Sequence, residues 1–397
     1  MKVMIFTDTF FPANDGVVTS IINSTRILAQ KGHKFIIIAP DYNNKKRIKL
    51  HPNIKIVRIK SMALPNYKEY RFVLPNYRKC LKVAESFKPD IIHIETYAVL
   101  GLLGAKVANK LKIPLIGTYH TIVAEFTKYF SPISLLGLDK LFNTGGGNKP
   151  GEREPMTKKF AWFITLNLFN KCKEVIVPSK AIKRELEKRG LNKKIIVVSN
   201  GVNLSLFTSK KNYSPKLRKI VHVGRISYEK NVDQTIKAFA LISEKYPLLN
   251  YEIIGSGPAV DSLKELVLNL KLENKVAFRG LVPHNNLPEH YKKSDLFITA
   301  STMETQGLVI LEAMASGLPI IGVDAYAVPD SVKNNINGFI VKKSDIESMA
   351  KKMEEFIKNP SLLKKLGKNS VKISKEHEIK KCTLEMEKVY INLIKNE

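Results

Sequence analysis

The 397-residue sequence has few of the residues that stabilise secreted proteins. It contains three cysteines and one tryptophan. Cys80, Cys172 and Cys382 are far apart and match no CxxC or zinc-binding spacing, which predicts reduced thiols in a cytoplasmic protein. A chain of this length buries enough apolar surface to fold without disulfides or metals.

Long hydrophobic runs are also missing. A helix that crosses a bilayer needs about 20 predominantly apolar residues. The longest candidate, FAWFITLNLF at 160–169, is too short and contains Asn167. The opening residues MKVMIFTDTFF do not read as a signal peptide, because Asp8 interrupts their apolar run. We therefore expect a cytoplasmic protein without a membrane span.

Acidic residues are scarce relative to basic ones. The chain has 36 Asp/Glu against 65 Lys/Arg, a formal net charge of +29, and residues 1–200 alone hold 35 basic and 14 acidic residues. This balance favours an acidic partner: nucleic acid, an anionic membrane surface or a phosphorylated ligand. The alternative is a lysine-rich composition imposed by an AT-rich genome. It explains the total net charge better than it explains the excess of basic residues in the first half.

Short β-branched apolar runs alternate with helical patterns along the chain. The runs lie at 2–8, 33–40, 54–60, 90–95, 113–120, 174–179, 194–201, 220–224, 251–255, 275–280, 295–301 and 318–324. Such alternation is typical of parallel sheets with helices on both faces. It predicts an α/β protein built from Rossmann-like domains.

A polar passage at 205–219 divides the pattern in two. We expect domains at 1–201 and 202–375, a linker near 202–218, and a final helix at 376–397 that packs back on the first domain. The passage 131–155 fits neither pattern, and is either a mobile element near an acceptor site or a flexible insertion.

Ligands of open α/β sheets bind beyond the carboxyl ends of the strands. Gly16 opens the helix after the first run, where the absent side chain lets an anion approach the helix N–H groups. His120 lies at the end of another run, in TYHT. An ordinary turn for Gly16 and a structural role for His120 are the alternatives.

The turn GRISYEKN at 224–231 carries Arg225 and Lys230. A planar guanidinium and a compact ammonium that converge beside a helix start suit a diphosphate. A solvated basic turn is the alternative explanation.

The segment ETQGLVILEAMASGLP at 304–319 places two glutamates eight residues apart. Amides of Gly307 and Leu308, at a helix start, can hold a phosphate. Glu304 can reach a sugar from the loop, and Glu312 can accept hydrogen bonds from two ribose hydroxyls. Two surface glutamates are the alternative, and spacing alone does not decide.

Together these segments resemble the retaining glycosyltransferases of family 4, whose E-x7-E signature Glu304 and Glu312 match. The other matching segments are the glycine turn at Gly16, DIIHIE, TYHT, SNGVN, GRISYEKN, GSGP and NGFIV. The resemblance covers nearly the whole chain. It implies the GT-B architecture: two Rossmann-like parallel-sheet domains facing a central cleft, with the C-terminal helix returning to the first domain.

The resemblance implies a role for each matched position. His120 and Glu304 are expected to be catalytic and to contact the transferred sugar, and no metal or other bound cofactor is expected. The expected donor-binding residues are Gly16, Arg225, Lys230, Arg279, Gly280, Thr305, Gln306, Gly307, Leu308 and Glu312. Two departures from the family stand out: the turn DAYAVPD at 324–330, usually glycine-rich, and Glu95, where relatives often carry other polar residues.

The stretches TYHTIVAEFTKYF (118–130) and STMETQGL (301–308) resemble the bacterial diacylglycerol glucosyltransferases of this family. That resemblance implies UDP-glucose as donor, diacylglycerol as acceptor, and peripheral association with the inner face of the cell membrane. The basic first half agrees, because each Lys or Arg near an anionic bilayer contributes about 1 kcal/mol.

The stretch 66–82 interleaves aromatic and basic residues, as an interfacial segment does; a solvated helix with a buried stripe is the alternative. Its expected membrane residues are Tyr67, Lys68, Tyr70, Arg71, Phe72, Arg78 and Lys79. A lipid glycosyltransferase is thus the leading hypothesis, ahead of one acting on a soluble or polyprenyl-linked glycan. A nucleic-acid-binding protein comes last, because no such motif is recognised and the paired glutamates stay unexplained.

Overall fold

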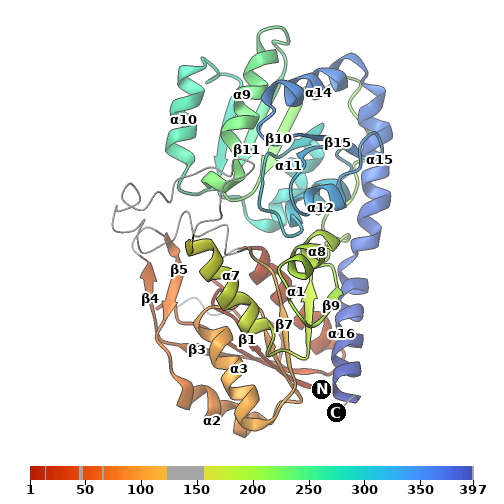
Figure 1. The fold of residues 1–397 in the computed structure, drawn as a ribbon. Coiled ribbons are helices and arrows are strands. Elements are labelled where there is room, and N and C mark those ends of the chain that lie inside the picture. The colour runs from red at the N-terminus through yellow and green to blue at the C-terminus, as the bar shows by residue number, and fades with distance from the viewer. Residues whose placement is uncertain (14, 44–47, 65–66, 123–155, 396–397) are drawn as a thin grey trace. The chain divides into compact units, whose positions relative to one another are not determined.

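The computed structural model describes residues 1–13, 15–43, 48–64, 67–122 and 156–395. The passage 131–155, singled out in the sequence, lies outside the described residues. The chain divides into two compact units, one formed by Met1–Val198 with Thr383–Glu397 and the other by Ser199–Cys382 (Figure 1).

The first unit contains a seven-stranded parallel sheet in the order β3-β2-β1-β6-β7-β8-β9. Its strands are β1 Lys2–Phe6, β2 Lys34–Pro40, β3 Ile54–Ile59, β6 Ile91–Ile94, β7 Leu115–Thr118, β8 Glu174–Val177 and β9 Lys194–Val197. Its helices are α1 Gly16–Gln30, α2 Tyr77–Phe87, α3 Val99–Leu111, α7 Met156–Phe169 and α8 Lys180–Lys188, with most of α16 Ile379–Lys395. All seven apolar runs of this half form the predicted strands.

The C-terminal helix α16 packs into the core of the first unit, as the sequence predicted. Val389, Tyr390 and Leu393 are buried in the same apolar cluster as Val3 and Ile5 of β1. Residues 379–382 belong to the second unit, so the last stretch of chain completes the unit that the first stretch begins.

The segment expected to be interfacial is not a single helix. Residues Tyr67–Val73 form β5, which pairs antiparallel with β4, Ser61–Leu64, and α2 starts only at Tyr77 (Figure 1). The aromatic residues and the valine of YKEYRFV favour a strand. The helix begins after Asn76, whose side chain accepts a hydrogen bond from the Lys79 N–H, as an N-cap residue does.

The second unit contains a six-stranded parallel sheet in the order β12-β11-β10-β13-β14-β15. Its strands are β10 Lys219–Val223, β11 Asn250–Ile254, β12 Val276–Gly280, β13 Leu296–Ile298, β14 Ile320–Val323 and β15 Gly338–Val341. Its α-helices are α9 Val232–Ser243, α10 Val260–Asn269, α11 Leu287–Lys293, α12 Leu308–Ala315, α13 Val328–Ser331, α14 Ile346–Lys358 and α15 Ser361–Ser374. Apolar clusters cover both faces of the sheet.

The predicted linker at 202–218 is instead part of the second unit. Val202, Phe207 and Leu217 are buried in its apolar clusters. Lys210 is buried as well, and its Nζ donates to the Ser294 carbonyl at 2.7 Å. The prediction of a linker relied on the polar composition of the passage. Its few apolar residues and Lys210 are enough to attach it to the second unit.

Each sheet has a topological switch point, where the order in which the strands are added reverses. In the first unit this point lies between β1 and β6, and in the second between β10 and β13. Crevices outside the carboxyl ends of strands at such switch points are the usual ligand sites of open α/β sheets. The residues that follow these strands, and those that follow neighbouring β7, are therefore the candidates for a ligand site in their own unit.

Candidate active site

Two turns meet at the switch point of the second unit. One follows β10 and ends in a short 3-10 helix, Tyr228–Lys230, and the other runs from β13 to the start of α12. The Nζ of Lys230 donates to Oε1 of Glu304 at 2.6 Å, and both side chains are largely buried, with 19% and 13% exposed. Two residues 74 positions apart in the sequence are thus brought together.

Asn231 connects the two turns, a role that no sequence motif indicates. Its backbone is left-handed, with φ of 49°. Its Nδ2 donates to the Ala300 carbonyl at 3.1 Å and lies 3.3 Å from Thr302 Oγ1. Asparagine tolerates this backbone better than most residues, and it can supply the donor that glycine lacks.

The charge of Glu304 is held in place by its neighbours. Burial acts to raise the pKa of its carboxyl, but Lys230, with smaller contributions from Ser301 and His222, brings the pKa below its usual value. Burial also lowers the pKa of nearby His222 to about 4, so this imidazole is neutral at neutral pH. The turn therefore presents one cation and one anion that neutralise each other until a ligand competes.

Helix α12 begins immediately after this turn. Its N-cap is Gly307, with φ of +77°, a backbone that side chains rarely adopt. A Cβ there would also lie 2.9 Å from Ile310 Cδ1. The first amides of a helix have no acceptor within it, and their dipole favours an anion, so Gly307 and Leu308 stand where a phosphate is expected.

Arg225 lies in the same turn and contacts an acid that the sequence analysis did not consider. Its guanidinium is 3.6 Å from Glu229, which is buried and also accepts from Ser227. Close by, the GSGP turn passes so near the backbone that a Cβ on Gly255 would lie 1.8 Å from the Gly224 carbonyl oxygen. The two glycine-bearing motifs therefore pack directly against each other.

Glu312 is not a surface residue of its helix. It is 6% exposed; Oε1 lies 2.9 Å from Nε2 of His284, and Oε2 accepts from the Tyr291 hydroxyl at 3.0 Å. The hydrogen bond to Glu312 raises the pKa of His284 above its usual value. Each carboxylate oxygen can accept more than one hydrogen bond, so a diol can still be bound from this position.

Three predicted donor residues are engaged elsewhere in the second unit. Arg279 Nε donates to buried Glu252 at 2.7 Å. Gln306 is buried, with Nε2 donating to Ser199 Oγ at 2.6 Å and Oε1 accepting from the Asn200 N–H at 2.9 Å. Gly280 has φ of +68° and its carbonyl accepts from the Gly255 N–H. Thr305 is half-buried in the turn between Glu304 and Gln306.

A second group of polar residues lies at the carboxyl edge of the first unit's sheet. His120 follows β7, and its Nε2 lies 2.7 Å from Oε2 of Glu95, which follows the adjacent strand β6. Exposed Gly16 opens α1, where Asp15 caps the helix by accepting from the Val18 N–H at 2.9 Å. The predicted position of His120 at a strand end is thus observed, with an acid beside it.

Comparisons with known proteins decide the family. The model of Glycosyltransferase Family 4 matches residues 14–206, and that of Glycosyl transferases group 1 matches residues 206–373. The chain is 31% identical to the alpha-monoglucosyldiacylglycerol synthase of Streptococcus pneumoniae, over 81% of this chain and 70% of that protein. The chain belongs to glycosyltransferase family 4.

Two further likenesses support this assignment. A synthase of the same name from Acholeplasma laidlawii is 28% identical to this glycosyltransferase, over 99% of the chain and 98% of that protein. The structure of HepE from Anabaena in complex with UDP-glucose has a TM-score of 0.77 at 18% identity, covering 99% of this chain and 100% of HepE. The fold is therefore the expected GT-B architecture, and the enzyme is a hexosyltransferase.

Some features of the glycosyltransferase bear on membrane and metal binding. No helix among residues the structure describes is long and apolar enough to cross a bilayer. Within those same residues, no three His, Cys, Asp or Glu side chains group as metal ligands would.

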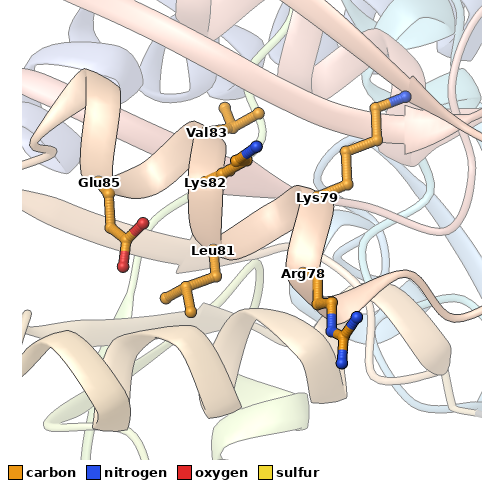
Figure 2. A pocket seen from close by; sticks show the side chains of 6 residues that line it. All are labelled: Arg78, Lys79, Leu81, Lys82, Val83 and Glu85. Atoms are coloured by element: carbon orange, nitrogen blue, oxygen red, sulfur yellow. The ribbon is translucent and has the colours of Figure 1, made fainter.

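The predicted membrane residues lie on β5 and α2 of the glycosyltransferase. Phe72 is 49% exposed, and Arg71 donates to Ser61. Arg78 and Lys79 are exposed on α2 and line an open hollow of about 560 Å³ (Figure 2). In Figure 2, Arg78 and Leu81 point to the same side of the helix. The side chains of Tyr67, Lys68 and Tyr70 lie outside the described residues.

Proposed function

We propose that this enzyme transfers glucose from UDP-glucose to a hydroxyl of diacylglycerol at a membrane surface, with retention of anomeric configuration. The observation that carries the proposal is the similarity to two alpha-monoglucosyldiacylglycerol synthases, one of them matched over nearly its whole length. The UDP-glucose bound by HepE supports the choice of donor.

In this proposal the second unit binds the donor. Lys230, Arg225 and the first amides of α12 bind the diphosphate, where cations and helix-end dipoles act together. Glu304 hydrogen-bonds the hexose, and Glu312 binds the ribose hydroxyls. The close pair of Lys230 and Glu304 supports this division, because the cation and the acid reach adjoining parts of one ligand.

Catalysis is then mainly electrostatic. As the bond between the hexose and the diphosphate breaks, negative charge grows on the leaving oxygen. In this scheme Lys230, Arg225 and the α12 amides stabilise that charge, and preorganised donors of this kind are usually the largest catalytic contribution. No metal is needed in this scheme, and His120 of the first unit contacts the transferred hexose.

The acceptor assignment rests partly on the surface of the first unit. Helix α7 turns Trp162 inward, 4% exposed, but leaves Met156, Phe160, Phe163 and Ile164 at 86%, 63%, 62% and 38% exposed. These side chains follow the spacing of one helix face. An apolar helix face within a strongly basic unit is what an anionic bilayer binds, and it supplements the predicted surface on β5 and α2.

The deciding experiment identifies the product. The purified enzyme is incubated with diacylglycerol vesicles and, separately, with UDP-glucose, UDP-galactose, UDP-N-acetylglucosamine and GDP-mannose. The expected product is an α-glucosyldiacylglycerol from UDP-glucose alone, identified by mass spectrometry and by the NMR coupling of its anomeric proton. Glycosylation of water-soluble or polyprenyl-linked acceptors, with no product from diacylglycerol, would instead establish the glycan hypothesis.

A further inference from the structure

The pair formed by Glu95 and His120 is enclosed by the first unit. Glu95 is 4% and His120 is 8% exposed. The Glu95 N–H donates to the Phe6 carbonyl at 2.9 Å, which fixes the residue beside the end of β1 at the switch point of the sheet. Their side chains meet at 2.7 Å from adjacent strands, so ring and carboxylate have little freedom to separate.

Behind Glu95 a chain of hydrogen bonds runs to the C-terminal helix. His93 Nε2 lies 2.7 Å from Thr118 Oγ1, and His93 Nδ1 lies 2.6 Å from the Tyr390 hydroxyl. The rings of His93 and Tyr390 meet edge to face, with centroids 5.6 Å apart. The network thus links the carboxyl edge of the sheet to α16.

The distances allow one consistent direction of donation among Tyr390, His93 and Thr118, and His93 Nδ1 also lies 3.4 Å from Glu95 Oε1. Tyr390 donates to His93 Nδ1, His93 donates from Nε2 to Thr118, and the Thr118 hydroxyl donates to Glu95. Burial lowers the pKa of His93, which keeps it neutral and able to accept from Tyr390. Burial acts to raise the pKa of Glu95, but the neighbouring His93, His120 and Thr118 together bring it below its usual value.

We propose that Glu95 is a positioning residue for His120. An ionised carboxylate at Oε2 keeps the proton on His120 Nε2 and holds the ring plane, so Nδ1 is the nitrogen that accepts a hydrogen bond in the neutral ring. A hexose hydroxyl can donate to that nitrogen. This inference rests on the proposed function, in which His120 contacts the transferred sugar, and it assigns Tyr390 the task of holding Glu95 through His93.

The same unit offers a matched control. Glu387, also on α16, has Oε1 at 2.6 Å from His33 Nε2. His33 immediately precedes β2, at the amino edge of the sheet, far along the strands from the carboxyl edge where His120 lies. Glu387→Gln therefore removes a buried carboxylate from a histidine of the same unit, and also from Lys31, without touching the candidate site.

The first test reads the tautomer directly and needs no activity. The enzyme is labelled with ¹⁵N-histidine, and the His120 signals are assigned by their loss in His120→Gln. At a pH where the ring is neutral, the expected spectrum shows a proton on Nε2 and none on Nδ1. In Glu95→Gln the signals shift or the two tautomers mix, and in Glu387→Gln they stay as in the wild type. A neutral His120 protonated at Nδ1 in the wild type would overturn the proposal.

The second test measures turnover. Misplacing a reacting geometry by about 1 Å can cost about 10²-fold in rate, so Glu95→Gln should lose about that factor in kcat with little change in the KM for the nucleotide sugar. Tyr390→Phe, which keeps the ring, should lose less, and Glu387→Gln should match the wild type. Wild-type kcat in Glu95→Gln would refute the positioning role.

The two proposals fail separately. If the wild-type enzyme glycosylates no lipid, the proposed function falls, while the tautomer spectrum still supports or overturns the role of Glu95. Trp162 is the only tryptophan and is buried in the first unit, so its emission spectrum checks that each variant is folded there. If Glu95→Gln does not fold, the tautomer of His120 in the wild type and the kcat of Tyr390→Phe test the positioning role instead.

Discussion

Lys230 and Glu304 follow the two central strands of the second unit's sheet, and their side chains meet at 2.6 Å between Nζ and Oε1. Without a ligand, the cation is already paired with the acid. A diphosphate that draws the ammonium toward itself releases the carboxylate to accept from a sugar hydroxyl. Under the proposed roles, binding of the donor exchanges one ion pair for two interactions with the ligand.

Lys230→Met should weaken UDP binding by about 10- to 100-fold, because a hydrogen bond to a charged group contributes about 1.5–3 kcal/mol. It should also destabilise the second unit, since Glu304 is left largely buried without its cation. Lys230→Met with Glu304→Gln should recover stability but no UDP affinity. Calorimetry with UDP measures the affinity, and hydrogen exchange of β10 and β13 measures the stability. Unchanged UDP affinity in Lys230→Met would contradict the proposed binding of the diphosphate by Lys230.

Asn231 permits a test of the connection between the two turns. Asn231→Gly keeps the left-handed backbone and removes the amide that donates to Ala300, whereas Asn231→Ala also adds backbone strain of about 1 kcal/mol. Both variants should lower kcat, and the alanine variant should unfold at a lower urea concentration. Equal stability of the two would show that the backbone at 231 relaxes, and wild-type turnover in both would remove Asn231 from the supporting structure.

His222 should make the second unit sensitive to mild acid. Its pKa is about 4 in the folded chain against an ordinary 6.5, so the unfolded state binds a proton that the folded state refuses between those values. Stability is then full above pH 6.5 and falls as pH drops toward 4, by about 2 kcal/mol at pH 5. His222→Phe, which still packs beside Phe297, should lose less stability than the wild type between pH 7 and 5. Hydrogen exchange of β10 at both pH values measures this, and equal losses would contradict the assignment.

The exposed face of α7 should contribute to vesicle binding. Phe160→Ser and Phe163→Ser should each reduce affinity for anionic vesicles by about tenfold, the loss expected for part of a phenylalanine's burial. Leu241→Ser and Leu248→Ser remove side chains of the second unit that are equally exposed, at 61% and 65%, and should have no effect. Sedimentation with vesicles of increasing anionic content, at low and high salt, provides the measurement. Binding indifferent to both phenylalanine variants would exclude this face.

The parallel sheets could be read from the sequence because the central strands are short runs of mostly apolar residues, as is typical of buried parallel strands. The β4–β5 hairpin was missed because Pro65 and the mixed residues of 66–82 resemble an amphipathic segment equally well. The attachment of 202–218 was missed because it depends on single contacts, such as that of Lys210, which leave no periodic pattern.

The residues of the candidate site that belong to a sequence motif could be predicted. The long-range contacts that hold them could not. Lys230 lies in the turn after β10, and Glu304 and Gly307 lie in the turn between β13 and α12. No local pattern shows that Asn231 reaches Ala300, that Glu312 contacts His284, or that Gln306 turns toward Ser199. Glu95 was noticed only as a departure from the family, and its partner became visible once β6 and β7 were adjacent.

The division of the first unit between the two ends of the chain has a consequence for biosynthesis. Residues 1–198 leave the ribosome first, yet Tyr390 and the rest of the buried face of α16 are translated only after the whole second unit. The second unit therefore has all its residues before the first does. The first unit of this enzyme stays incomplete until α16 has been translated.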